Sequence, residues 1–402
     1  VKDLKNAGIE ITIGQAFENI PAGTELIVYT VAIETYDPEL FARLKAQEIP
    51  IRSYPQMLGI VSKDKYTIAI CGTHGKTTTT GMIAHMMREL DPTVVIGSLL
   101  VGTKSNFIAG KSKPARLNGR SVGYFIAEAC EYRRSFLNLS PKILVITNIE
   151  EDHLDYYKDL ADIQSAFREL AMKVPEDGFV VCDSSSSNLK PVLEGVKAKI
   201  IDVKEFVHKR KLMLPGEHNQ YDAALAGAVG SLVGMGGDKA DEALATFPGT
   251  WRRFELKGEL EGGAKLYDDY AHHPTEIKVT LDGFRELYPA DAGYKITVIF
   301  QPHLFSRTKA FLNDFAKELS KADFCLILPI YQAREVDDGT ISAQVLVEKI
   351  FEAGGKATNY ENFTEAEKAL QNIAFGSKDI VLTLGAGDAY KIGENMLKNK
   401  GN

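Results

Sequence analysis

The chain has 402 residues, of which 45% are hydrophobic and 25% charged, and its formal net charge is −7. This length exceeds what one ordinary hydrophobic core supports, so two or three domains are expected. The composition is that of a soluble globular protein, and no apolar run reaches the roughly 18 residues that a membrane span needs. The acidic balance argues against a nucleic-acid partner, so we expect a cytoplasmic protein that binds neither nucleic acid nor membrane.

The cysteines have neither disulfide-type nor metal-type spacing, and we interpret them as reduced core residues: Cys71, Cys130, Cys182 and Cys325. The chain begins at Val1 without the pattern of a secretory signal. We expect a protein that is shortened at its front end.

The first 64 residues predict a short α/β segment that is too small for an independent domain. It has a strand at 25–29 and a helix at about 38–47. After it, apolar strand-like runs alternate with helical patterns, which predicts right-handed βαβ units around a largely parallel sheet. The strands of this second block are expected at 66–71, 123–128, 143–147 and 179–182, with helices after residue 76 and at 160–172.

A third block repeats the pattern, with strands expected at 265–269, 296–300, 324–328 and 380–384. Two successive α/β domains therefore follow the short first segment. The predicted boundaries are 1–64, 65–250 and 251–402.

The motif Gly72-Thr73-His74-Gly75-Lys76-Thr77-Thr78 joins a buried strand to a helix. Glycines let backbone N–H groups approach phosphate oxygens, Lys76 brings a positive charge to the β- and γ-phosphates, and the Thr77 hydroxyl can bind Mg²⁺. The spacing is shorter than the general G-x-x-x-x-G-K-[ST] pattern, which leaves a glycine turn with a surface lysine as the alternative. The flanking strand and helix favour an ATP-binding loop.

Acidic residues and a histidine follow the next two strands, at Glu128, Glu131 and within 150–155. The carboxyl ends of parallel strands lie at one edge of a sheet, so these side chains should lie beside the phosphate loop. One or two carboxylates with Thr77 would suffice to hold Mg²⁺. His153 is equally consistent with a structural role, and the remaining acids are expected to cap helices or face solvent: Glu131, Glu150, Glu151, Asp152 and Asp155.

Later motifs each allow an ordinary and a functional interpretation. His218-Asn219 precedes a helix predicted at 223–233 and is typical of a helix cap. Arg252-Arg253 is either a solvated pair or a source of positive charge for a transferred phosphoryl group. The other two motifs follow strands. In Asp269-Tyr270-Ala271-His272-His273-Pro274 the proline suits a first helical turn, and histidines at such a corner are rarely core residues. In Gln301-Pro302-His303-Leu304-Phe305-Ser306-Arg307 the arginine suits a carboxylate.

Taken together, these strings resemble the Mur ligase family and its folylpolyglutamate synthase relatives over almost the whole chain. The resemblance rests on G-T-x-G-K-T-T, N-I-E-x-D-H-L-D, R-R-F-E, D-D-Y-A-H-H-P and F-Q-P-H-x-x-x-R-T. It implies a three-domain α/β architecture: a truncated N-terminal Rossmann-like domain, a central P-loop ATPase-like domain and a C-terminal Rossmann-like domain. The family's glycine-rich turn that holds UDP does not precede Val1.

The resemblance also implies roles for individual residues. Those that would contact ATP are Gly72, Thr73, His74, Gly75, Lys76, Thr77, Thr78, His218, Asn219, Arg253 and Asp269. Those that would hold the metal are Thr77, Glu128 and His153. Those that would contact substrate are Asn106, Tyr270, His272, His303 and Arg307. The catalytic group would be Lys76, His272, His273 and Arg307. Two positions depart from the family pattern: Asp222 replaces an asparagine near the adenine, and Leu304 stands where many alanine-adding members carry arginine.

The activity implied by the resemblance is carboxylate activation by ATP, through an acyl phosphate, followed by attack of an amine. ATP and Mg²⁺ are the expected cofactors, and UDP-N-acetylmuramate and L-alanine the expected substrates, in peptidoglycan precursor synthesis. His272 or His273 could act as the base for the amine. Two alternatives stay open: a related ligase that adds another amino acid or a peptide, and an ATP-binding homologue without turnover. A monomer or weak homodimer is expected.

Overall fold

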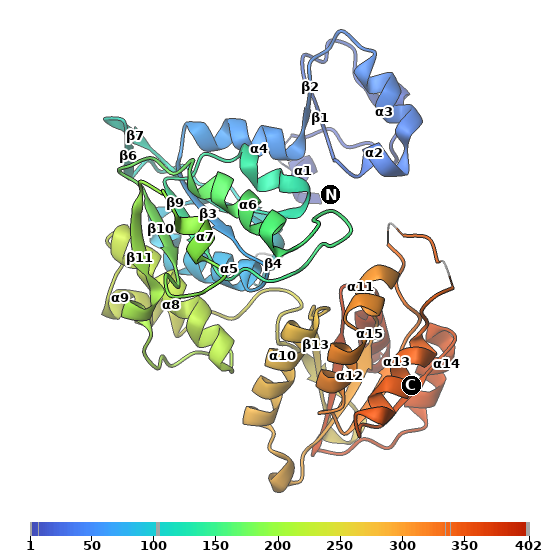
Figure 1. The fold of residues 1–402 in the computed structure, drawn as a ribbon. Coiled ribbons are helices and arrows are strands. Elements are labelled where there is room, and N and C mark those ends of the chain that lie inside the picture. The colour runs from blue at the N-terminus through green and yellow to red at the C-terminus, as the bar shows by residue number, and fades with distance from the viewer. Residues whose placement is uncertain (1, 7, 102–104, 334, 338, 399–402) are drawn as a thin grey trace.

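The computed structural model describes residues 2–6, 8–101, 105–333, 335–337 and 339–398. Figure 1 shows a small N-terminal segment in blue, a central domain in cyan to yellow-green and a C-terminal domain in yellow to red. Within these residues, the central domain has a seven-stranded sheet and the C-terminal domain a six-stranded sheet. The predicted α/β class with largely parallel sheets is therefore confirmed.

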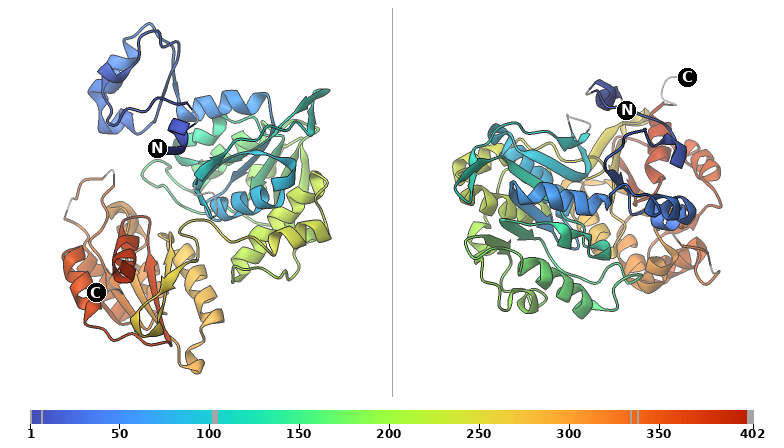
Figure 2. Two further views of the ribbon diagram at one scale, coloured as in Figure 1. Left: turned by 180° about the vertical axis from the view of Figure 1, so that it is seen from behind. Right: turned by 90° about the horizontal axis from the view of Figure 1, so that it is seen from above.

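The N-terminal segment contains one parallel strand pair, β1 (Ile27–Tyr29) and β2 (Ile51–Ser53). Its small core consists of Ile33, Leu40 and Leu44, from α2 (Ile33–Tyr36) and α3 (Pro38–Lys45), and Phe17 of the 3-10 helix η1 (Phe17–Asn19) packs against it. The helix α1 (Lys2–Asn6) precedes these elements. The segment stands apart from the rest as a lobe, seen from behind and from above in Figure 2. The helix α4 (Tyr54–Lys63) leads into the central domain.

The central sheet has the order β11-β10-β9-β3-β8-β4-β5, and each neighbouring pair is parallel except β4 and β5. Its middle strand β3 is buried on both faces, as expected for a parallel sheet covered by helices. The strands are β3 (Tyr66–Cys71), β4 (Thr93–Leu100), β5 (Ser105–Ile108), β8 (Tyr124–Glu128), β9 (Ile143–Ile146), β10 (Phe179–Cys182) and β11 (Lys199–Asp202). A separate antiparallel pair is formed by β6 (Ala115–Leu117) and β7 (Arg120–Val122).

Helices pack against this sheet. The longest, α8, packs against α5, the helix that follows the phosphate loop. The helical elements are α5 (Lys76–Met86), η2 (Arg88–Leu90), η3 (Tyr132–Asn138), α6 (Leu160–Ala171), α7 (Lys190–Leu193), η4 (Val203–Phe206), α8 (Glu217–Leu232) and α9 (Asp238–Leu244).

The C-terminal sheet has the order β12-β13-β17-β14-β15-β16 and is parallel except between β12 and β13. Its strands are β12 (Glu255–Glu259), β13 (Lys265–Asp269), β14 (Lys295–Phe300), β15 (Phe324–Ile327), β16 (Ala357–Asn359) and β17 (Asp379–Leu384). Its helical elements are η5 (Glu261–Gly263), α10 (Pro274–Leu287), η6 (Ala290–Ala292), α11 (Phe305–Ala310), α12 (Leu312–Leu319), α13 (Ala343–Glu352), α14 (Phe363–Gln371) and α15 (Ala389–Lys398).

The two large domains meet along the segment that leads into β12. Trp251 donates its backbone N–H to Leu99 O at 2.8 Å, and Ser98 Oγ donates to Trp251 O at 2.9 Å. A β-bridge between Leu100 and Thr250 continues this contact. The junction therefore attaches the end of β4 to the start of the C-terminal domain.

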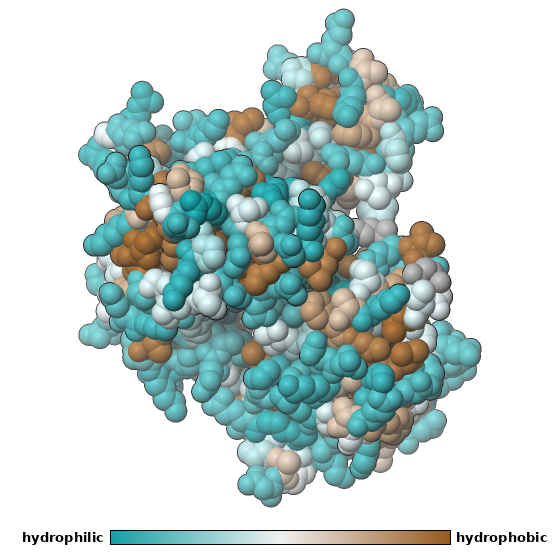
Figure 3. Space-filling view, viewed as in Figure 1, coloured by the Kyte–Doolittle hydropathy of each residue, from teal (hydrophilic) through white to brown (hydrophobic). Residues whose placement is uncertain are grey.

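The surface in Figure 3 is mainly hydrophilic, with hydrophobic residues in separate groups. Among the described helices, none combines the length and apolar character that a bilayer crossing requires. All four cysteines are free thiols. Three of them are buried, as expected, but Cys130 is exposed, so its assignment to the core was wrong.

Each predicted strand and each predicted helix lies within a few residues of an observed one. The prediction missed β2, β4, β5, β6, β7, β11, β12 and β16. It also placed His218 and Asn219 before α8 as a cap, whereas both lie in the first turn of that helix, whose N-cap is Gly216. The cap interpretation of this pair was therefore wrong.

Candidate active site

A cavity of about 500 Å³ lies between the central and C-terminal domains. Many of the residues selected from the sequence line it: Thr73, His74, Gly75, Lys76, Thr77, Thr78, Glu128, His153, His218, Asn219, Arg253, Asp269, Tyr270 and His272. Five others do not line its wall: Gly72, Asn106, His273, His303 and Arg307. Segments distant in the sequence thus converge on one space.

The phosphate loop turns from β3 into α5 at two glycines with positive φ. Gly72 has φ of 138° and Gly75 has φ of 79°, in a region that other residues rarely adopt. A side chain at Gly75 would also approach Asp222 Oδ1 to 2.7 Å. Gly75 is the N-cap of α5 without a side-chain cap, so the first N–H groups of this helix are available to an anion.

Lys76 extends back over its own loop. Its Nζ donates to Gly72 O at 2.5 Å, to Thr73 O at 2.9 Å and to Glu131 Oε1 at 3.0 Å. Burial alone would lower the pKa of Lys76, but the negative charge of Glu131 outweighs it and raises the pKa. Lys76 is therefore a fixed positive charge at the cavity wall.

The residues proposed for the metal present oxygen donors next to this lysine. Thr77 Oγ1 donates to Glu128 Oε1 at 2.9 Å, and Glu128 Oε2 accepts the Gly97 N–H at 2.7 Å. Nearby, Glu131 Oε2 is buried without a hydrogen-bond partner. A hydroxyl, a carboxylate and an unsatisfied carboxylate oxygen beside a phosphate loop suit a hard cation such as Mg²⁺.

His153 lies on the same side of the cavity and has a φ of 53°, a left-handed conformation uncommon for residues other than glycine. Its Nε2 is 3.5 Å from Glu131 Oε1 and 3.8 Å from Asp152 Oδ2. The imidazole is thus held among carboxylates at the end of the loop that follows β9.

The expectation that the neighbouring acids cap helices or face solvent was wrong for two of them. Glu131 and Asp152 are buried, with 4% and 9% of their surfaces exposed. Burial would raise the pKa of Glu131, but Lys76 and His153 lower it. Glu151 and Asp155 are exposed, in agreement with the expectation, and Asp155 accepts a hydrogen bond from Tyr132.

Another part of the cavity is formed by the first turns of α8. Asn219 Nδ2 donates to Pro215 O at 2.5 Å and lies 3.1 Å from His218 Nε2. Burial, assisted by Arg253, lowers the pKa of His218 to about 4, so its ring is neutral. Burial raises the pKa of Asp222 to about 7, which makes this carboxyl a titrating group inside the cavity.

The two adjacent arginines at the domain junction have different environments. Arg252 is buried within the C-terminal domain, where Nε donates to Asp268 Oδ2 at 2.7 Å and Nη2 donates to Gly385 O at 2.6 Å. Arg253 lines the cavity and stacks over Tyr270 at 5.0 Å. Only Arg253 is placed to meet a bound ligand.

Asp269, at the end of β13, fixes the loop that carries Tyr270. Its Oδ2 accepts the Phe254 N–H at 2.7 Å and its Oδ1 accepts the Ala271 N–H at 2.8 Å. Burial raises its pKa to about 6, although Arg253 opposes the shift. Asp269 therefore combines a structural role with a position at the cavity wall.

The consecutive histidines face different directions. His272 lines the cavity, and its Nδ1 lies 3.1 Å from Glu276 Oε2. His273 is buried, with 4% of its surface exposed, and caps α10 by accepting the Thr275 N–H at 3.3 Å. The expectation that neither histidine is a core residue was wrong for His273.

Arg307 forms an ion pair between domains instead of facing the cavity. Its Nη2 donates to Asp152 Oδ1 at 2.7 Å, and Nη1 lies 3.4 Å from His303 Nδ1. Arg307 is therefore already bonded to a carboxylate, the chemical group for which it was selected. Asn106 is exposed on β5, and its side chain is not part of the cavity wall.

Glu276, which the sequence analysis did not select, connects the domains at the phosphate loop. Its Oε2 accepts the His272 N–H at 2.9 Å, and its Oε1 lies 3.2 Å from His74 Nδ1. Thr275 Oγ1 also donates to Glu150 Oε2 at 3.0 Å. The capping-box position of Glu276, three residues after His273, was a signal in the sequence that could have identified it.

Comparison with known proteins covers nearly the whole chain. Three family patterns match: the Mur ligase family catalytic domain at 1–66, the Mur ligase middle domain at 70–190 and the Mur ligase glutamate ligase domain at 252–387. The UDP-N-acetylmuramate–L-alanine ligase of Agathobacter rectalis is 38% identical over 99% of this chain and 90% of its own length. The enzyme of that name from Caldanaerobacter subterraneus subsp. tengcongensis is 38% identical over 99% of this chain and 89% of its length.

Solved structures agree with these sequence matches. The UDP-N-acetylmuramate–alanine ligase of Thermotoga maritima has a TM-score of 0.75 and 26% identity, covering 98% of this chain and 89% of its own. A murein peptide ligase from Psychrobacter arcticus has a TM-score of 0.69 and 24% identity, and the match covers 100% of this chain and 91% of its own. At this identity the likeness supports the fold alone. Because of the identity and coverage of its relatives, the chain belongs to the Mur ligase family.

Proposed function

We propose that this protein is an ATP-dependent ligase that joins L-alanine to the lactyl carboxylate of UDP-N-acetylmuramate, in peptidoglycan precursor synthesis. The observation that carries the proposal is the single cavity lined by the phosphate loop of one domain and by Arg253, Tyr270 and His272 of the other. The two relatives cited above, at 38% identity, have this activity in their names. We also propose a cytoplasmic location for the reaction.

In the first half of the reaction, the lactyl carboxylate attacks the γ-phosphoryl group of ATP and forms an acyl phosphate and ADP. Lys76 and the N-terminus of α5 stabilise the phosphate charge, and Arg253 adds a second positive group from the other domain. Thr77, Glu128 and His153 would hold Mg²⁺, which offsets the negative charges that meet in this step.

In the second half, the amine of L-alanine attacks the acyl carbon, and loss of phosphate leaves the amide. His272 is the histidine at the cavity wall, which favours it over His273 as the group that takes the proton from the amine. Arg307 would bind the alanine carboxylate once its bond to Asp152 is exchanged. Closure of the domains keeps water from the acyl phosphate.

The test is ADP release by the purified chain with ATP, Mg²⁺ and UDP-N-acetylmuramate, with a panel of amino acids and one tripeptide as acceptors. L-alanine is expected to give the highest kcat/KM. Release that depends on another amino acid or on the peptide would instead favour a related Mur ligase. ATP binding by calorimetry without release for any acceptor would favour a non-catalytic homologue.

Two organisational features belong to the same proposal. We propose domain boundaries at 64/65 and 250/251, which leave each large sheet within one domain. We also propose that the protein acts as a monomer or weak homodimer. Sedimentation over a range of protein concentrations tests the latter.

A further inference from the structure

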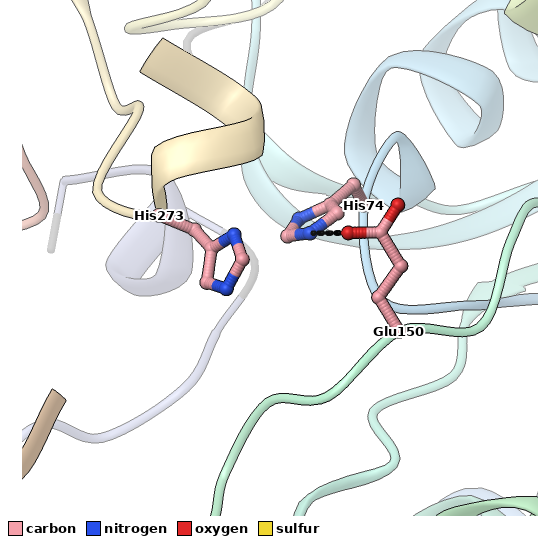
Figure 4. Close-up of side chains that lie close together, drawn as sticks. All are labelled: His74, Glu150 and His273. Atoms are coloured by element: carbon pink, nitrogen blue, oxygen red, sulfur yellow. Dashed lines mark ion pairs between the residues drawn. The ribbon is translucent and has the colours of Figure 1, made fainter. Parts of the chain in front are cut away.

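Three side chains meet where the phosphate loop faces the C-terminal domain. His74 lies between Glu150, which follows β9, and His273 at the start of α10 (Figure 4). One ligand atom from each residue lies within 4.8 Å of the other two. We propose that His74, Glu150 and His273 bind a Zn²⁺ ion that links the central domain to the C-terminal domain. This site is separate from the proposed Mg²⁺ residues and does not depend on the ligase activity.

The ring nitrogens of the two histidines are divided between structural contacts and open positions. His74 Nδ1 faces Glu276 Oε1 at 3.2 Å, and His273 Nδ1 accepts the Thr275 N–H at 3.3 Å. Both Nε2 atoms are buried without a hydrogen-bond partner among the described residues. That of His74 faces Glu150 Oε2 at 3.6 Å as an ion pair. A buried polar atom without a partner costs free energy, and a metal ion bound by Glu150 would satisfy His74 Nε2.

The separation of the ligand atoms requires only a small contraction. Three atoms no more than 4.8 Å apart lie within about 2.8 Å of a common centre, whereas zinc–nitrogen and zinc–oxygen bonds are about 2.0–2.2 Å. Each ligand atom would therefore move inward by less than about 1 Å. Rotation of the Glu150 side chain, 40% of which is exposed, can supply part of this movement.

The donor set favours zinc over magnesium. Two imidazole nitrogens and one carboxylate are a known zinc combination, which leaves a fourth position for water, whereas Mg²⁺ prefers oxygen ligands. Other side chains already orient the ligands: Glu276 holds the His74 ring, and Thr275 Oγ1 donates to Glu150 Oε2 at 3.0 Å. A carboxylate behind a ligating histidine is the usual support of such sites.

The charges around the cluster are compatible with a divalent cation. Burial lowers the pKa of His273 to about 4, so its ring is neutral and can bind a metal at neutral pH. Burial would also lower the pKa of His74, but Glu150 and Glu276 raise it to about 9. A zinc ion would take the place of the His74 proton beside the same two carboxylates.

A metal held by both domains would oppose their separation. His74 and Glu150 belong to the central domain, whereas His273 belongs to the C-terminal domain. Turnover in a two-domain ligase requires opening for product release, so Zn²⁺ should inhibit in the presence of excess Mg²⁺. Inhibition is a secondary readout, because it presupposes the proposed activity.

The primary experiment is equilibrium dialysis of the full chain with Zn²⁺ in excess Mg²⁺. Glu150→Gln and His273→Gln are compared with matched controls: Glu151→Gln, an exposed neighbour, and His208→Gln, an exposed histidine in another part of the central domain. We expect one Zn²⁺ bound to the wild type and to both controls. Each ligand variant should bind it at least about tenfold more weakly.

X-ray absorption at the zinc edge of the wild-type complex is a second measurement that needs no variant. Two imidazole ligands and no sulfur are expected. Weak Zn²⁺ binding by the wild type, affinity unchanged in both ligand variants, or sulfur coordination would each overturn the proposal. Thermal unfolding of each variant shows whether a loss of zinc binding reflects a loss of fold.

Discussion

The central-domain wall and the C-terminal wall of the cavity are constructed differently. On the central side, Lys76, Thr77 and Glu128 contact groups of their own domain, and all three line the cavity. On the C-terminal side, Arg307 and His273 are directed at the other domain and lie outside the wall. The positions of Lys76, Thr77 and Glu128 are therefore fixed within one domain, whereas those of Arg307 and His273 depend on how closely the domains approach. Four experiments test this difference.

The largest effect is expected at Lys76, on the central-domain wall. Lys76→Met removes the charge nearest the phosphate loop, so kcat should fall by about 10²–10³-fold, the range typical of losing one transition-state donor. Steady-state ADP release measures it. Lys63→Met, an exposed lysine at the end of α4, is the control. A fall smaller than about threefold would contradict the assigned role.

The contact between the walls should be visible in the pH dependence of stability. The pKa of His74 is raised from about 6.5 to about 9 in the folded chain. The protonated His74 ring therefore contributes about 3 kcal/mol to the free energy of unfolding below about pH 6.5. This contribution is lost as the pH rises through 9. Denaturant unfolding of the wild type and His74→Gln, with chelator present, measures it.

The difference in the free energy of unfolding between the wild type and His74→Gln should be largest near pH 6 and small near pH 10. A difference that grows with pH would contradict the ion pairs of His74 with Glu150 and Glu276. His208→Gln provides a comparison at an exposed ion pair, where a much smaller effect is expected.

Arg307 tests whether an interdomain pair exchanges for substrate. Arg307→Gln should raise the KM for L-alanine by about 10- to 100-fold, the value of a charged hydrogen bond, with little change in the KM for ATP. Arg116→Gln, at an exposed position of β6, is the control. An increase confined to the KM for ATP would show that Arg307 does not bind the amino acid.

The smallest expected effect concerns Asp222, a buried residue of the central wall beside Gly75 of the phosphate loop. Its pKa of about 7 means that the carboxyl gains charge as the pH rises through neutrality. ATP binding should then weaken by about two- to fivefold between pH 6 and 8, because like charges repel. Asp222→Asn should remove this dependence in a calorimetric titration, and Asp238→Asn should keep it.

The phosphate loop could be predicted because its signal is local. The buried strand β3, the two glycines and the start of α5 follow each other in the chain. Edge strands such as β12 could not be predicted from the sequence. The segment Glu-Leu-Lys-Gly-Glu becomes a strand only because it pairs with β13.

The burial of the acidic residues was missed for a related reason. The partner of Glu131 lies 55 residues away, and the partner of Asp152 lies 155 residues away. A carboxylate seen without its partner is correctly assigned to solvent on average. The different positions of His272 and His273 likewise depend on the direction in which α10 begins, which two identical neighbouring residues do not reveal.

Glu276 has a consequence for how motion in this protein can be observed. One carboxylate accepts the amides of His272 and His273 and also faces the imidazole of His74. The first turn of α10 therefore shares an anchor with the phosphate loop, and the amide hydrogen exchange of His272 and His273 will report the approach of the domains without any added label.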